Sequence, residues 1–167
     1  MSVEAWLNGP VEGVAPLLMP VAHSLMQAKA DLRSTVSDVD DDVLWKRPGG
    51  AASIGFHLRH IPGSADRLLT YALGEGLSSE QMAVLAAEKE PAGPGAAQLL
   101  DRIDDTLDRV LEAVRHIPES QLTEVRYVGR ARIPSTVIGL LFHIAEHTQR
   151  HTGQVIATAK IVRSADG

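Results

Sequence analysis

The chain of 167 residues has a formal charge of −5 and no cysteine, which excludes disulfides, cysteine-based zinc sites and a thiol nucleophile within the protein. No cluster of Lys and Arg offsets the acidic charge, so binding to a nucleic-acid backbone is not expected. Hydrophobic residues make up 44% of the chain but aromatic residues only 4%, which favours helices packed through aliphatic side chains over a sheet.

The first residues, MSVEAWLNGPVEG, lack the basic start and the apolar run of a secretion signal. The sequence also has no uninterrupted apolar stretch of about 18 residues, the length that a membrane-spanning helix needs. We therefore expect a cytoplasmic protein that neither spans nor binds a membrane. The length predicts that residues 1–167 form a single domain.

The first helix is predicted over residues 15–36, where apolar side chains recur at helical spacing. An acidic connection that contains proline and glycine follows over 37–53. Its last residue, Ser53, is a plausible N-cap for a second helix, IGFHLRHIPGSADRLLTYALG. Pro62 removes a backbone hydrogen bond inside this helix, so we expect the axis to bend just after His60.

Two further helices are predicted in the middle of the chain. The segment SSEQMAVLAAEKE is interpreted as a short helix with Ser78 or Ser79 as its cap, and PAGPG after it as a loop. Residues 96–117 have the strongest helical periodicity, and Pro118 ends that helix.

The segment LTEVRYVGRARIPST is predicted to be irregular or briefly extended. Pro134, Ser135 and Thr136 then open the last long helix, TVIGLLFHIAEHTQRHTGQVIATAKIV. The pattern gives four long helices and one short one, with no internal repeat. The simplest architecture for this set is an all-α fold, a four-helix bundle with one extra short helix.

Three of the seven histidines fall at steps of four in the segment FHIAEHTQRHTGQ, as His143, His147 and His151. Four residues advance a helix by about 6 Å and slightly more than one turn, so neighbours in this series share a face. Two imidazoles at this spacing can bind one metal ion, whereas His143 and His151, about 12 Å apart along the axis, cannot easily share it. The spacing predicts a metal-binding pair but does not decide which pair.

A second group of histidines occurs in HLRH, where His57 and His60 are three residues apart on the second predicted helix. One of them and a pair from the last helix would give an ion three neutral nitrogen ligands. Such a site keeps at least one position for water or substrate, which is typical of catalytic rather than structural centres. Gln154 follows His151 by three residues, and it could either hydrogen-bond to a ligand histidine or cap the core.

Two familiar metal motifs do not fit. A zincin requires Glu directly after the first histidine, where this chain has Thr148. A carboxylate-bridged di-iron bundle requires Glu-x-x-His on two helices, but Gln149 stands three residues after Glu146. Simple packing and a pH-sensitive switch remain open for the cluster. His23 and His116 are expected to be ordinary packing or surface residues.

Several segments resemble the DinB/YfiT-like proteins. These are SIGFHLRHIPGSADRLLTYALG, LLFHIAEHTQRHTGQV and the connection LWKRPGGAASIG before the second helix. The similarity extends from about Leu17 to Ile161. Its central motif is a histidine after an apolar run, followed much later by His-x-x-x-His-x-Gly-Gln.

The resemblance implies a four-helix bundle that binds one divalent ion, with zinc or nickel the usual expectation. The three family ligands match His60, His147 and His151 of this sequence. His57 and His143 match positions that are not the core ligands. Relatives are often homodimers, so the resemblance also implies a homodimer.

The resemblance says less about the reaction. Some relatives are transferases or isomerases that use a low-molecular-weight thiol, and others are described only as metal-dependent hydrolases. We expect a metalloenzyme in which the ion activates a thiol cosubstrate or water for transfer to, or hydrolysis of, a small molecule. Glu146 and Asp66 are the nearby acids in the sequence, and neither is assigned as a general base. The alternative is a non-catalytic module whose histidines bind metal for stability or sensing, or only pack.

Overall fold

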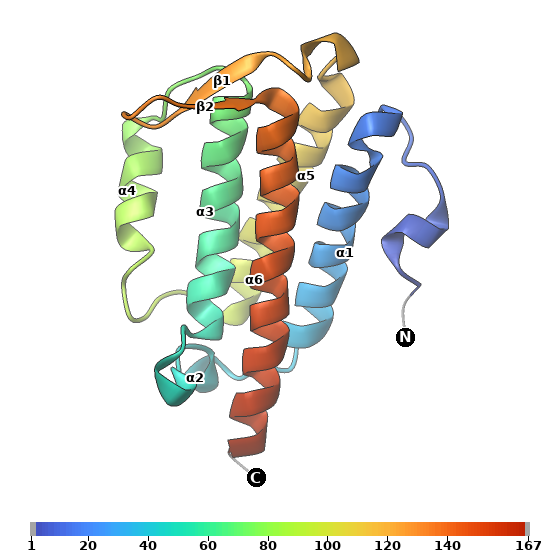
Figure 1. Ribbon diagram of the computed structural model, residues 1–167. Coiled ribbons are helices and arrows are strands. Elements are labelled where there is room, and N and C mark those ends of the chain that lie inside the picture. The colour runs from blue at the N-terminus through green and yellow to red at the C-terminus, as the bar shows by residue number, and fades with distance from the viewer. Residues whose placement is uncertain (1–2, 166–167) are drawn as a thin grey trace.

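The computed structural model describes residues 3–165, so the two outermost residues at each end of the predicted 1–167 domain lie outside the described part. Four long helices run side by side and form a bundle (Figure 1). They are α1 (Met19–Val36), α3 (Ile54–Ala72), α5 (Ala96–His116) and α6 (Val137–Ala165). The predicted all-α four-helix bundle is confirmed.

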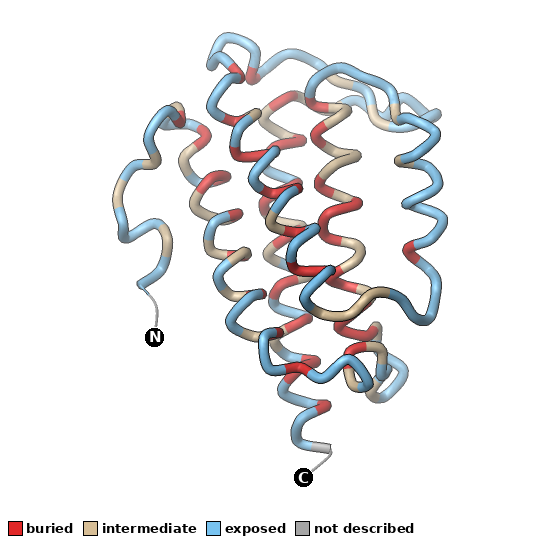
Figure 2. Tube along the Cα trace, turned by 180° about the vertical axis from the view of Figure 1, so that it is seen from behind, coloured by how far each residue is buried: buried red, intermediate tan, exposed pale blue. Residues whose placement is uncertain are grey.

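Aliphatic side chains fill the centre of the bundle. Buried residues lie on the inward sides of the four long helices (Figure 2). Each helix contributes leucines that are fully removed from water, including Leu25, Leu58, Leu107 and Leu141. Burying one such side chain stabilises the folded state by about 2 kcal/mol. The low aromatic content of the sequence therefore does not prevent the formation of a continuous core.

The boundaries of α1 and α3 follow from local chemistry. Residues Pro16–Leu18 form a 3₁₀ turn, so α1 begins at Met19 rather than at the predicted residue 15. Ser53 caps α3 as predicted, because its side chain accepts a hydrogen bond from the Phe56 backbone N–H at 3.1 Å. The helix continues through Pro62 as one element.

Short elements join the long helices. The acidic connection contains α2 (Asp41–Leu44), and 3₁₀ turns occur at Ala5–Asn8, Pro48–Gly50 and Glu119–Gln121. The segment predicted to be irregular or extended forms a hairpin across one end of the bundle (Figure 1). Its strands, β1 (Val125–Val128) and β2 (Ile133–Thr136), are antiparallel with Val125 opposite Thr136. None of the described helices combines the length and the apolar character needed to cross a bilayer.

The short helix α4 (Ser79–Ala87) lies outside α3 and has no buried residue of its own (Figure 1). Of the two candidate caps, Ser78 is the one used, in a capping box with Gln81. Polar contacts attach the helix to the bundle: the Gln81 side chain donates to Asp66 at 2.7 Å and to Thr70 at 2.8 Å. Its position over α3 therefore depends on hydrogen bonds more than on an apolar face.

Candidate metal centre

Three histidines from two neighbouring helices converge. His60 comes from α3, and His147 and His151 come from successive turns of α6. One nitrogen of each ring lies within 4.8 Å of the other two. The Nε2 atoms of His60 and His147 are 3.2 Å apart. The structure thus brings together the three residues that match the family's ligands, and all three rings are partly accessible.

The spacing of these nitrogens fits a transition-metal ion. Zinc binds imidazole nitrogen at about 2.0–2.1 Å, so two nitrogens in a tetrahedral site are roughly 3.3 Å apart. The 3.2 Å between His60 and His147 agrees with that value. His151 needs only a small approach to complete a three-nitrogen site. Neutral imidazoles also suit nickel.

A carboxylate orients the first of these rings. Nδ1 of His60 lies 2.7 Å from Oε2 of Glu88, just after α4. Such a bond places the ring proton on Nδ1 and leaves the Nε2 lone pair free for an ion. The other oxygen, Oε1 of Glu88, accepts a hydrogen bond from Arg67 at 2.6 Å. The Glu88 carboxylate therefore fixes both the tautomer and the direction of His60.

Glu88 is only 4% exposed, which is unusual for a carboxylate. Burial alone would raise the pKa of Glu88, but its hydrogen bonds to His60 and Arg67 outweigh burial and hold that pKa below its ordinary value. The carboxylate is thus a buried charge with two partners. The sequence gives no sign of this residue, because no regular spacing relates Glu88 to the histidines of α3.

A fourth histidine orients His151. Nδ1 of His57 lies 2.8 Å from Nδ1 of His151, so one of these nitrogens donates and the other accepts. If His151 donates, its Nε2 is the nitrogen left for an ion. His57 is 4% exposed, and burial, helped by the charge of His60, lowers the pKa of His57 to about 4. Near neutral pH the His57 ring is therefore uncharged and can accept this bond.

The pKa values of two ligand candidates are lowered as well. Burial first, then the charges of nearby histidines, lowers the pKa of His147 to about 4 and that of His151 to about 3. Each ring therefore has a free nitrogen lone pair at neutral pH. That is the protonation state that a divalent metal requires of its histidine ligands.

The two other candidates do not join the cluster. His143 is exposed, and its Nδ1 contacts Glu146 at 2.6 Å, although its ring centroid lies 5.3 Å from that of His147. The carboxylate of Glu146 is also held by two hydrogen bonds from Arg150. Gln154 is exposed and makes no hydrogen bond within residues 3–165. It therefore neither supports a ligand through such a bond nor covers the core.

The cluster is closed on its inner side. The hollow bounded by Ile61, Leu68 and Ile144 beside His147 and His151 has no room for a water molecule. Phe56 stacks on the His60 ring with 5.6 Å between centroids and an angle of 6° between the planes. A ligand of a bound ion would therefore approach from the solvent side, beside an aromatic ring.

We expect Gly63→Ala to lower the affinity for Zn²⁺ about tenfold without removing a ligand. A Cβ at Gly63 would collide with the Glu88 carboxylate and come within 3.0 Å of Arg67, so the support for His60 must shift. Competition titration against a chromophoric chelator measures this change.

The matched control is Gly153→Ala on α6, because a Cβ there meets no atom within 4 Å. Its zinc affinity should stay within about twofold of the unmodified protein, and Glu88→Gln should resemble Gly63→Ala. Equal affinities for Gly63→Ala and Gly153→Ala would contradict the assigned role of Glu88.

The sequence and the fold are similar to those of known proteins. The DinB superfamily matches residues 24–155. A crystal structure from Exiguobacterium sibiricum, described as a candidate member of the DinB family, has a TM-score of 0.70 at 15% identity, covering 89% of this chain and 93% of the other. YfiT from Bacillus subtilis, described as a probable metal-dependent hydrolase with an unusual four-helix-bundle topology, has a TM-score of 0.66 at 14% identity, covering 91% of each chain. The comparison with curated proteins gave no match. The match over residues 24–155 shows that this chain belongs to the DinB superfamily.

Proposed function

We propose that this chain is a metalloenzyme that holds one divalent ion, zinc or nickel, through His60, His147 and His151. The observation that carries the proposal is the convergence of three histidine nitrogens within 4.8 Å of one another. Two of the rings have their other nitrogen occupied, by Glu88 and by His57. Such outer contacts are what metal-binding histidines usually have. The description of YfiT as a probable metal-dependent hydrolase also supports the proposal.

We propose that the substrate is a small molecule, with a low-molecular-weight thiol or water as the nucleophile. A divalent ion at three histidines would lower the pKa of a thiol or water that binds beside them. The thiol must come from a cosubstrate because the chain contains no cysteine. The reaction would be either thiol transfer to an electrophilic small molecule or hydrolysis.

The chain's own residues would position the reactants. The Phe56 ring stacked on His60 offers an apolar wall on the open side of the cluster. Glu146 is the acid nearest in sequence to His147, but His143 and Arg150 occupy its carboxylate. Burial alone would raise the pKa of Glu146, but the hydrogen bonds from Arg150 and His143 outweigh burial and lower this pKa. A carboxylate held in this way is a weak base, so we do not assign it as the general base.

A second candidate is a non-catalytic metal module. The closed hollow beside His147 and His151 favours it, because no substrate can enter from that side. The two candidates differ in whether a small exogenous ligand reaches the ion.

Cobalt(II)-loaded protein is expected to develop a sulfur-to-cobalt charge-transfer band when 2-mercaptoethanol is added. Three neutral ligands leave the full charge of the ion to attract an anionic thiolate, so the band should grow as pH rises and the thiol loses its proton. The band should be absent in His147→Ala and retained in His143→Ala, whose ring lies outside the triad. If cobalt binds but neither thiols nor other small anions change its spectrum at any pH, the non-catalytic candidate is the correct one.

A further inference from the structure

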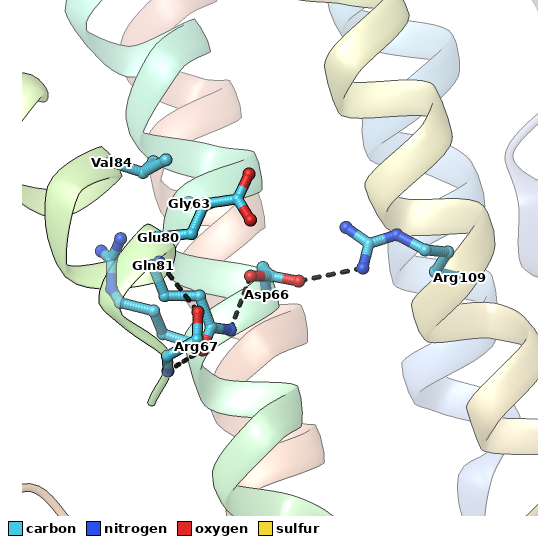
Figure 3. Close-up of a pocket in the computed structure, with 8 residues that line it drawn as sticks. Gly63, Asp66, Arg67, Glu80, Gln81, Val84 and Arg109 are labelled. Carbon is cyan, nitrogen blue, oxygen red and sulfur yellow. Dashed lines mark hydrogen bonds and ion pairs between the residues drawn. The ribbon is translucent and has the colours of Figure 1, made fainter. Parts of the chain in front are cut away.

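A cleft opens between α4 and α5, on a different side of α3 from the histidines. It consists of two adjoining hollows with volumes of about 340 and 400 Å³. The two hollows share Gly63, Asp66, Val84 and Arg109 in their walls. Figure 3 shows the α4 half, with Asp66 on α3 between Gln81 and Arg109. The metal-centre proposal uses none of the three side chains among them, those of Asp66, Val84 and Arg109.

Asp66 and Arg109, which line both hollows, form an ion pair whose charges cancel. Asp66 accepts a hydrogen bond from Arg109 at 3.0 Å and another from Gln81 at 2.7 Å (Figure 3). In the α4 half, Arg67 is bound to Glu88, and the remaining charge is the exposed carboxylate of Glu80. The α4 half therefore does not favour an anion.

The α5 half has the opposite balance. Besides the Asp66–Arg109 pair, its walls carry two guanidinium groups, Arg59 and Arg102, and one carboxylate, Asp105. The hollow therefore has a net charge of about +1 in a chain whose formal charge is −5. A local positive charge on an acidic protein attracts anions to that place.

Arg59 contributes charge but few free donors. It donates to the backbone carbonyls of Ala87 at 2.9 Å and Glu90 at 3.0 Å, and it stacks over Trp45 at 4.4 Å. Burial lowers the pKa of Arg59, and the positive charge of Arg102 lowers it further, while the charges of Glu90 and Glu88 oppose this change. Arg59 and Arg102 are thus close enough to repel each other.

Arg102 has its donors available. Among the described residues it makes no hydrogen bond or ion pair, unlike Arg59 and Arg109. A guanidinium offers five N–H donors in a planar fork that matches a carboxylate or a phosphate. Beside it, the Val84 side chain is 42% exposed and supplies an apolar surface, whereas Pro62 and Leu99, which also line the hollow, are buried. The hollow therefore combines one free fork for an anion with a surface for an aliphatic chain.

We propose that the α5 half of this cleft binds a small organic anion, with its carboxylate or phosphate group on Arg102 and its aliphatic part against Val84. The charge of Arg59 adds to the attraction. This site is separate from the histidine cluster, and its ligand needs no metal. If experiments contradict the metal centre, the anion site can still be correct, and the reverse also holds.

Amide NMR titration of the full-length protein tests this proposal. Hexanoate and hexyl phosphate should shift amides of α4 and α5 around the cleft in a saturable way at millimolar concentration. Acetate should bind more weakly because it lacks the chain, and hexanol because it lacks the charge. Whichever of hexanoate and hexyl phosphate binds more tightly shows whether the site prefers a carboxylate or a phosphate group.

Arg102→Ala should weaken the binding of the better anion about tenfold, the effect of removing a charged hydrogen-bond donor. The matched control is Arg130→Ala in the hairpin turn, which removes an equal charge from an exposed arginine that does not line the cleft. That control should change the affinity less than about twofold. Equal weakening in both variants would overturn the proposal. So would equal binding of hexanol and hexanoate, or the absence of saturable shifts around the cleft.

Discussion

Replacing His147 by alanine is expected to lower the affinity for Zn²⁺ by more than about a hundredfold, because loss of a ligand exceeds the 10- to 100-fold effect of losing an outer hydrogen bond. Only two of the three converging nitrogens would remain. His60→Ala and His151→Ala should have similar effects. Competition titration and elemental analysis of the purified variants measure bound zinc directly.

His143→Ala is the matched control for this prediction. His143 lies one turn before His147 on the same helix, yet it is exposed and outside the converging group. Its replacement should leave zinc binding within about threefold of the unmodified protein, because it removes no ligand and no support of one. Retention of stoichiometric zinc by the His151→Ala variant, with loss in the His143→Ala variant, would show that the wrong pair has been assigned.

Much of the helical framework can be predicted because it depends on local patterns. The apolar spacing of residues 96–117 agrees with α5 to within one residue, since that helix buries a stripe of its own side chains. The caps Ser53 and Ser78 are visible in the sequence for the same reason: each bonds an N–H only three residues away.

The short elements are harder to predict because their partners are distant. The four-residue helix α2 has no measurable periodicity, and the Asp41 side chain in it accepts a hydrogen bond from the Ala96 N–H, 55 residues away, at the start of α5. The hairpin strands have four residues each, and the side chains of β1 alternate only between exposed and half-buried. Such strands lack the apolar alternation that marks a strand in a sequence.

The site was only partly predictable for a similar reason. A spacing of four on one helix is visible in the sequence, so a metal-binding histidine pair could be predicted, but only the family resemblance assigned it to His147 and His151. The choice between His57 and His60 depends on how α3 is rotated against α6, and the spacing left it open. Glu88 was missed because its contact with His60 requires the docking of α4, which polar contacts outside the core determine.

The metal-free protein is expected to lose stability as pH falls from about 6.5 to about 4. In the unfolded chain a histidine takes up a proton near pH 6.5. In the folded protein the pKa is about 4 for His57 and His147 and about 3 for His151. Between these values the unfolded state binds more protons, so the free energy of unfolding rises with pH. The full stability is therefore present above pH 6.5 and is lost as pH falls through this window.

We expect a loss of about 3 kcal/mol across this window, well below the sum of three ideal titrations, because the rings of His147 and His151 are partly exposed and solvent screens their charges. Urea unfolding in the presence of a chelator measures it. A His147→Gln/His151→Gln variant should lose much less, since two titrating groups are gone, while His116→Gln, at an exposed site, should behave like the unmodified protein.

Saturating zinc should add about 4 kcal/mol at neutral pH when present at a thousand times its dissociation constant. That gain should shrink on acidification, because protons compete with the ion for the same nitrogens. A zinc gain that is unchanged between pH 7 and pH 5 would mean that the ion binds elsewhere than at these histidines.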